Sequence, residues 1–339
     1  MSLSTPSSVP LARPASFTGN TVLHHLLSRP LAALFLLLLV DFFAIPGFFH
    51  LEIRDGHLYG SVIDIVNRAA PLMLAAMGMT LVIATRGIDV SVGAVVAISG
   101  TVAAMLVAGG QGLGLALAAG MGAALLCGLW NGLLVAALGL QPIIATLILM
   151  VAGRGLAQLF SDGQIITVYE PAAFFFLGSG YLLGLPFSLF VVAAVFALTA
   201  LMMRKTALGL FIQTVGINPV AARLAGLRTA ALIFFAYLFC SACAGLAGLM
   251  IASNIKSADA NNAGLLLELD AILAVTLGGG QLSGGKFSLA GSLIGALIIQ
   301  TLTYAIYALG VPPQVTMVVK AVVVFGVCIS QSSTLRRAA

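Results

Sequence analysis

Long apolar runs separated by short breaks extend through most of this chain of 339 residues. A helix needs about 20 residues to cross the hydrocarbon core of a bilayer, and this requirement divides the runs into ten predicted spans. They lie near residues 30–48, 69–85, 93–109, 113–138, 142–160, 185–203, 230–252, 267–280, 288–309 and 313–331. Only 7% of the residues are charged, against about 25% in soluble domains. The chain is therefore a membrane protein, and not a soluble domain, a disordered chain or an anchored soluble enzyme.

The apolar runs are continuous, whereas the strands of a membrane β-barrel alternate apolar and polar residues over about ten positions. Because backbone amides in hydrocarbon must bond within their own segment, the predicted fold class is all-α, a polytopic transmembrane helical bundle. We expect an amino-terminal tail at residues 1–29, a transmembrane domain at residues 30–331 and a second tail at residues 332–339. Asp41 interrupts the first run and no small-residue cleavage site follows it, so we expect an uncleaved first span and not a signal peptide.

Basic residues divide unevenly between the two sides that ten spans would define. The amino-terminal side receives ten of them: Arg13, Arg29, Arg86, Arg204, Lys205, Arg223, Arg228, Lys286, Arg336 and Arg337. The other side receives only three: Arg54, Arg68 and Lys256. Cytoplasmic loops are enriched in Lys and Arg, so we expect both termini in the cytoplasm. This asymmetry explains the net charge of +5 without nucleic-acid binding.

Residues that carry enzyme or metal chemistry are sparse. All four histidines lie within the first 57 residues, and the intramembrane acids Asp41, Asp89 and Asp270 form no paired motif. The four cysteines lie in apolar runs, where they are expected to serve as small packing residues. They are Cys127, Cys240, Cys243 and Cys328. We expect no catalytic residue and no metal site.

A phosphate-loop pattern, G-x-x-x-x-G-K, begins at Gly280, but its context excludes nucleotide binding. Phe287 stands where the Ser or Thr that holds Mg²⁺ is required, and no α/β domain surrounds the pattern. We therefore expect this chain to bind no cofactor and to hydrolyse no ATP itself.

Two Gly-rich segments, Arg86–Gly93 and Gly278–Gly285, repeat the same pattern. Three of eight positions coincide, namely Gly87 with Gly279, Ser91 with Ser283, and Gly93 with Gly285. Transporters built from repeats place Gly-interrupted spans at corresponding positions near their pathway. Six predicted crossings between the segments imply a parallel repeat, whereas a miscount of one span would make it inverted, so both remain open.

The connection at residues 204–228 predicts a short helix near residues 219–225. Asn218 can cap the first turn, Pro219 fits the first helical position and Gly226 can provide a left-handed stop. A helix of this length is not stable alone in water. Since its apolar residues share one stripe, we expect it to pack on the bundle or, preferentially, to dock another subunit.

Several motifs resemble those of bacterial sugar ABC importer permeases over about residues 60–330. The motifs are Thr206–Gly209, Gly216–Asn218, Ala221-Ala222-x-x-x-Gly226, Gly87–Gly93, and Glu268-Leu-Asp270-Ala-Ile followed by Gly278–Gly285. Residues Asp259–Gly264 and Thr206–Ile212 resemble the galactofuranose type within that family. Three residues depart from the family pattern: Arg86 stands where the family usually has Gly, and Leu210 and Ile217 replace Arg and Gly.

The resemblance implies a permease subunit of the bacterial inner membrane that imports a monosaccharide. Its partners would be a second permease, two ATPase subunits that bind ATP and Mg²⁺, and a periplasmic sugar-binding protein. The residues implied in ATPase coupling are Gly209, Gly216, Asn218, Pro219, Ala221, Ala222 and Gly226. Those implied in the pathway and its gating are Gly87, Asp89, Ser91, Gly93, Asn131, Asp270, Gly279, Ser283 and Gly285.

Two other functions remain open from the sequence. A permease for branched-chain amino acids would require an anion and a cation along the pathway, which Asp270 and Lys320 could supply. An ion-coupled transporter would require an intramembrane acid that titrates during transport. Polar residues such as Ser99, Thr101, Thr146, Gln300 and Thr303 could line a sugar pathway, although bonding to helical carbonyls is the simpler explanation for each. Arg154 is too costly in a membrane to be idle, and it could pair with Asp270 or Lys320 inside the bundle.

Overall fold

The computed structural model describes residues 19–54 and 56–312, with side chains from Arg29 onward, and eight residues between 315 and 326. The predicted span at residues 313–331 lies largely outside the described residues, and the tail at residues 332–339 lies entirely outside them. The first helix begins at Gly19, within the predicted tail at residues 1–29.

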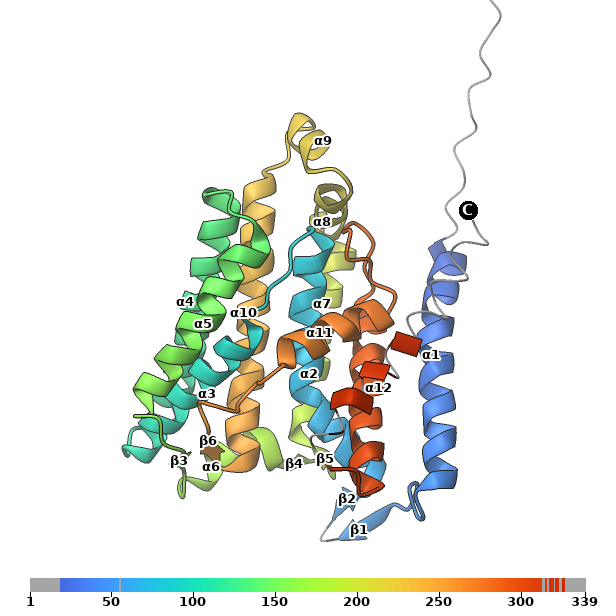
Figure 1. Ribbon diagram of the computed structural model, residues 1–339, viewed down its shortest axis with the longest axis vertical. Coiled ribbons are helices and arrows are strands. Elements are labelled where there is room, and N and C mark those ends of the chain that lie inside the picture. Colours follow the sequence, from blue (N-terminus) through green and yellow to red (C-terminus); the bar gives the residue numbers. More distant parts are fainter. Residues whose placement is uncertain are drawn as a thin grey trace, which may run out of the picture.

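Helices make up almost all of the described structure (Figure 1). They are α1 (Gly19–Ala44), α2 (Ser61–Ala84), α3 (Val92–Ala108), α4 (Leu113–Gly132), the π-helix η1 (Leu133–Ala137), α5 (Pro142–Phe160), α6 (Ala172–Ser179), α7 (Phe187–Lys205), α8 (Leu208–Ile217), α9 (Pro219–Leu224), α10 (Thr229–Ile255), α11 (Leu267–Leu277) and α12 (Leu289–Ala308). Three antiparallel strand pairs lie in the loops at one end of the bundle. They are β1 (Glu52–Arg54) with β2 (His57–Tyr59), β3 (Ile166–Thr167) with β6 (Ser257–Ala258), and β4 (Tyr181–Leu182) with β5 (Leu185–Pro186).

The helical membrane bundle predicted from the apolar runs is confirmed. Among the described residues, six helices are long and apolar enough to cross a bilayer: α2, α4 with η1, α5, α7, α10 and α12. Each of the first nine predicted spans contains a helix, but α3 has 17 residues and α11 only 11. Each of these two helices follows a non-helical segment, and the helix alone is too short to cross a bilayer. The number of ten spans therefore stays a prediction.

Helices α2 and α10 pack along each other in opposite directions at the centre of the bundle (Figure 1). Each is followed by a non-helical segment and then by a short helix that begins inside the molecule, α3 after α2 and α11 after α10. The same order in opposite directions favours the inverted relation between the two halves. An inverted repeat would match Arg86–Gly93 with the segment 257–266 before α11, so the pairing of Arg86–Gly93 with Gly278–Gly285 stays a prediction.

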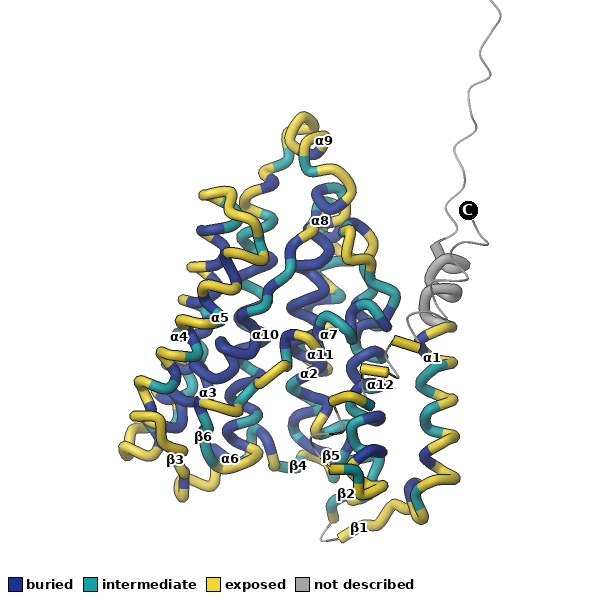
Figure 2. The backbone as a smooth tube through the Cα atoms, in the orientation of Figure 1, coloured by how far each residue is buried: buried dark blue, intermediate teal, exposed yellow. Residues whose placement is uncertain are grey.

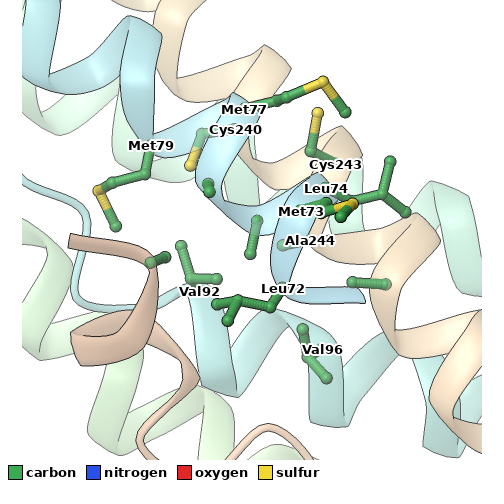
Figure 3. Close-up of a cluster of buried hydrophobic side chains, with 14 of the residues drawn as sticks. Leu72, Met73, Leu74, Met77, Met79, Val92, Val96, Cys240, Cys243 and Ala244 are labelled. Carbon is green, nitrogen blue, oxygen red and sulfur yellow. The ribbon is translucent and has the colours of Figure 1, made fainter. Parts of the chain in front are cut away.

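The core lies where α2, α3 and α10 meet. Figure 3 shows Met77 and Met79 of α2, Val92 and Val96 of α3, and Cys240 of α10 gathered between these helices. The most apolar window of α2 is 78% buried, whereas that of α7 is 17% buried. Apolar residues on the outer helices α4, α5 and α7 are correspondingly exposed (Figure 2), as expected of surfaces that face lipid or another membrane subunit.

Small residues allow the close packing of α10. A Cβ added to Gly248 would clash with the backbone of Val96 in α3, and one added to Gly78 in α2 would lie 2.7 Å from the Cα of Cys240. Cys127, Cys240 and Cys243 are buried free thiols. Their interpretation as packing residues is thus confirmed, while Cys328 lies outside the described residues.

We predict that Gly248→Leu destabilises the fold by roughly 1–3 kcal/mol or more, because the added side chain has no space between α10 and α3. Gly155→Leu in α5 is the matched control, since nothing lies within 4 Å of a Cβ at that position. Thermal unfolding in detergent measures the effect. Equal melting temperatures for the two variants would contradict the packing of α10 described above.

Candidate functional site

The coupling segment, residues 206–228, forms one end of the molecule, called here the α9 end (Figure 1). Hydrogen-bond and packing contacts place Arg86 and Gly285 beside α8 at this end. The carboxyl end of α2, the start of α12 and the start of α10 lie here as well. The described basic residues that the sequence assigned to the amino-terminal side lie in α1, at the end of α7, in the coupling segment or in the loops after α2 and before α12. They are Arg29, Arg86, Arg204, Lys205, Arg223, Arg228 and Lys286.

Helix α9 is held by caps at both ends. The Asn218 Oδ1 accepts hydrogen bonds from the amides of Val220 and Ala221, both at 3.0 Å, and Pro219 occupies the first helical position. Gly226 follows the helix with φ of 83°, in the left-handed region. The predicted helix at residues 219–225 is confirmed to within one residue.

The rest of the coupling segment differs from the sequence interpretation. Residues 204–228 were expected to be a connection with one short helix, but Leu208–Ile217 form a second helix, α8. Gly209 packs at its start, where a Cβ would clash with the carbonyl oxygen of Met203. The apolar sequence of α8, LGLFIQTVGI, is too short to count as a span, which is why the sequence analysis missed it.

Most of α9 is exposed (Figure 2), and its exposed residues include an apolar stripe. Leu224 is 87% exposed and Val220 is 64% exposed, whereas Ala222 faces inward and is fully buried. One face of the helix is thus packed on the bundle, and the opposite face is exposed. An exposed apolar stripe on a capped helix is suited to binding another protein subunit.

The carboxyl end of α8 contacts both Gly-rich segments. A Cβ on Gly216 would clash with the carbonyl oxygen of Ala84 and the amide of Gly285. The Gly285 amide in turn donates to the Ala84 carbonyl at 3.0 Å. Gly285 was predicted as a gating residue and Gly216 as a coupling residue, and the structure brings the two together at one junction.

A second group of predicted residues forms a buried polar cluster at the break between α2 and α3. The Asp89 Oδ1 accepts hydrogen bonds from the amide and hydroxyl of Ser91, at 2.9 and 2.6 Å. The Asn131 side-chain amide donates to the Ser91 hydroxyl at 2.8 Å. All three residues are fully buried. Asn131 lies just before the π-helix η1, a helix distortion often found at functional sites.

The two interior helix starts meet beside this cluster. A Cβ on Gly93, in the first turn of α3, would clash with the carbonyl oxygen of Gly264 and with Oε2 of Glu268, in the first turn of α11. Glu268 is 7% exposed. Helix amino termini carry partial positive charge, which favours a carboxyl group placed between two of them, and the positive charge of the Arg154 guanidinium also favours it.

The segment before α11 is held by α5. The Arg154 guanidinium donates to the carbonyl oxygens of Ala260 and Ala263, at 3.2 and 2.6 Å. Arg154 thus has backbone partners, and the negative charges of Glu268 and Asp259 act on its guanidinium as well; its predicted pairing with Asp270 or Lys320 stays a prediction. In the same segment, hydrogen bonds from the Asn262 side chain and from the backbone amides of residues 261 and 262 lower the pKa of the Asp259 carboxyl.

The remaining predicted pathway residues lie apart from the buried cluster. Asp270 is half-buried in the first turn of α11, and Ser283 is exposed in the loop before α12, where Gly279 has φ of 87°. Ser99, Thr146 and Thr303 donate to backbone carbonyls, which favours the simpler structural explanation for these three. Lys320 lies outside the described residues.

Three residues that contribute to these sites were not identified from the sequence. Arg86 was noted only as a departure from the family pattern, yet its side chain bonds to α8. Glu268 was only part of a motif, and Tyr237 was not noticed at all. The hydroxyl of Tyr237 lies against Gly87, and a Cβ there would come within 2.5 Å of it. No local sequence pattern marks Tyr237, because its role depends on which helix α10 faces.

A polar cavity of about 180 Å³ lies near the opposite end, between α2, α7, α10 and α12. Its polar lining includes Asn67, Arg68, Asn254 and Gln300. Arg68 also contacts Asp64 at 2.8 Å, so the cavity presents amide and guanidinium groups with little net charge. No group of three or more His, Cys, Asp or Glu side chains within the described part of the chain is arranged to hold a metal ion.

We predict that Asn131→Leu destabilises the chain by roughly 1–3 kcal/mol, because it removes a donor from buried Asp89 and Ser91. Asn131→Asp should be worse, since it places a second carboxyl group beside Asp89 without water. Thermal unfolding of the two variants and the unmodified chain measures this. Wild-type stability of both variants would contradict the role of the cluster.

Comparisons with known proteins agree on one family. The family description "Branched-chain amino acid transport system / permease component" matches residues 61–328. The galactofuranose transporter permease of Escherichia coli K12 is 53% identical over 302 residues, 89% of this chain and 88% of that protein. The fructose import permease of Bifidobacterium longum is 37% identical over 337 residues, 95% of this chain and 93% of that protein.

The ribose import permease of Escherichia coli K12 is 36% identical over 299 residues, 87% of this chain and 90% of that protein. No solved structure gives a significant match. The matches cover the bundle, both Gly-rich segments and the coupling segment. The chain therefore belongs to this family of transport-system permease components, together with these sugar permeases, and is a membrane transport subunit and not an enzyme.

Proposed function

We propose that this chain forms the membrane pathway of an importer for a neutral monosaccharide, galactofuranose, driven by ATP hydrolysis on separate subunits. The observation that carries the proposal is α9, a capped helix whose apolar stripe is exposed at the basic end of the bundle. ATPase subunits would bind this stripe, a periplasmic binding protein would deliver sugar to the opposite end, and a second permease would complete the pathway.

The proposed orientation places the α9 end in the cytoplasm of a bacterium. The described basic residues that gather there support it, because cytoplasmic loops of inner-membrane proteins are enriched in Lys and Arg. We propose ten crossings of the membrane. In two of them, the non-helical segment before α3 or α11 and the helix that follows it cross the membrane together. Both termini would then lie in the cytoplasm.

The assignment of galactofuranose rests on the 53% identity to the galactofuranose permease and on the charge balance of the interior. A zwitterionic amino acid would require a free anion and a free cation to bind it. The Arg154 guanidinium donates to backbone carbonyls and Arg68 is paired with Asp64, so both side chains are already engaged in contacts within the chain. Amide groups around the polar cavity suit hydroxyl groups, which both donate and accept hydrogen bonds.

The proposed mechanism is alternating access. Closure of the ATPase subunits would move α9, and α8 would carry that movement to the end of α2 and to the loop before α12. The interior helix starts at Gly93 and Leu267 would then shift against each other, since their glycines allow backbone contact without side chains between them.

We predict that Leu224→Asp abolishes binding of the ATPase subunit and reduces uptake by at least about tenfold, because it puts a charge into an apolar contact. Leu183→Asp is the matched control, since Leu183 is 88% exposed and lies between β4 and β5 at the opposite end. Co-purification with the ATPase and vesicle uptake measure the two effects. Wild-type ATPase binding by Leu224→Asp would refute the docking site.

We predict that uptake of labelled galactofuranose by the assembled transporter is inhibited by excess galactofuranose and not by leucine. A cargo that is recognised by hydrogen bonds to hydroxyl groups should not be displaced by a molecule without them. Inhibition by leucine at the same concentration would instead support an amino-acid permease.

A further inference from the structure

The Arg86 side chain makes the most specific contact between the coupling segment and the rest of the bundle. Its Nε donates a hydrogen bond to the Gly216 carbonyl and its Nη2 donates one to the Ile217 carbonyl. Gly216 and Ile217 are the last two residues of α8. The final carbonyls of a helix lack partners within the helix and carry partial negative charge, so a guanidinium group satisfies both needs at once.

The backbone of Arg86 adopts a conformation that its residue type disfavours. Its φ is 68°, in the left-handed region. The Arg86 amide donates to the Ile83 carbonyl and the Gly87 amide donates to the Val82 carbonyl, the pair of bonds that ends a helix in a Schellman motif. Glycine is the usual residue at this position of the motif. An arginine held here points to a use for its side chain that outweighs the backbone strain.

Arg86 also lies at the point where three segments meet. The Gly285 amide donates a hydrogen bond to the Ala84 carbonyl at 3.0 Å, and Ala84 lies two residues before Arg86. A Cβ on Gly284 would come within 2.5 Å of the Arg86 Cγ and 3.1 Å of the Gly216 carbonyl oxygen. The end of α2, the end of α8 and the loop before α12 therefore pack closely at their glycines, with the side chains of Arg86 and Ile217 between them. We call this contact the Arg86 junction.

The chain leads directly from the Arg86 junction to the buried polar cluster. Only Gly87 and Ile88 separate Arg86 from Asp89, which bonds to Ser91 at the start of α3. Gly87 is fixed against Tyr237 of α10. A displacement of the end of α8 would therefore reach the break between α2 and α3 through the two hydrogen bonds of Arg86 and the three residues that follow it.

We propose that Arg86 is a positioning residue that transmits movement of α8 and α9 to the break between α2 and α3, an inference that rests on the proposed function. Through its two hydrogen bonds, the end of α8 moves together with the end of α2. Without them, α9 could still bind the ATPase, but its movement would reach the α2–α3 break only through the packing of glycines.

Arg86→Gly tests the proposal, because the left-handed φ suits glycine and the substitution removes only the side chain. The permease is reconstituted with its ATPase and binding protein in proteoliposomes, and ATP hydrolysis and labelled galactofuranose uptake are measured together. We expect unchanged assembly, an unchanged or higher melting temperature, and a fall in sugar imported per ATP hydrolysed by roughly tenfold, within the usual range of coupling between sites.

Two further variants separate transmission from simple helix capping and from loss of charge. Arg86→Lys keeps the charge but lacks the planar fork that can reach two carbonyls, so it should restore only part of the coupling. Arg29→Ala removes an exposed basic residue of α1, outside the coupling segment and the junction, and should leave coupling unchanged.

The proposal is overturned if Arg86→Gly imports as much sugar per ATP as the unmodified permease. It is equally overturned if lost uptake follows a matching loss of assembled complex or of melting temperature, because a purely structural cap would behave in that way. These outcomes differ from failure of the proposed function, in which Leu224→Asp would leave the ATPase bound or galactofuranose would not be transported at all.

Discussion

The structure depends on burying two breaks in its backbone inside an apolar bundle. Helices α3 and α11 both begin in the interior, so the non-helical segments before them contain amide and carbonyl groups that lipid could not satisfy. The protein meets this constraint with close backbone contact at Gly93 and Gly264 and with polar side chains placed beside the breaks. Asn131 bonds to the first break through Ser91, and Arg154 bonds to the second through two carbonyls.

This constraint explains why most charged or amide side chains at depth have structural partners. Asp89, Asn131, Arg154 and Glu268 would be hard to justify in helices that simply cross a membrane. Here each serves backbone that is not helical or a helix start that faces another. The same breaks are the parts of the bundle that can shift with the fewest side chains to repack. These breaks are connected to the exposed helix α9 through the Arg86 junction, which is the connection that the proposed transport function requires.

The sequence predicted the features that are local and missed those that depend on direction in space. Apolar runs predicted the helices of the first nine spans, and Asn218-Pro219 with Gly226 predicted α9, because caps are determined by neighbouring residues. The relation between the two Gly-rich segments could not be decided from the sequence, because identity at Gly and Ser positions carries no information about the direction of the preceding helix.

The site was predicted in part for the same reason. The cluster of Asp89, Ser91 and Asn131 joins residues from one motif with a residue 40 positions later, and the sequence supplied each as a separate candidate. Tyr237 and Glu268 could not be ranked, since their importance comes from packing against glycines on other helices. Arg86 had one signal, an unusual residue type at a helix end, but its partners in α8 are 130 and 131 residues away.

The central claim is that the chain is a gate without its own energy source, moved through α9 and the Arg86 junction by subunits that hydrolyse ATP. The most direct measurement is sugar accumulation in proteoliposomes that contain the purified chain alone, compared with vesicles that also contain the ATPase and binding protein. The account predicts accumulation against a gradient only in the complete system and only with ATP. Concentrative uptake by the chain alone, driven by an ion gradient, would contradict it.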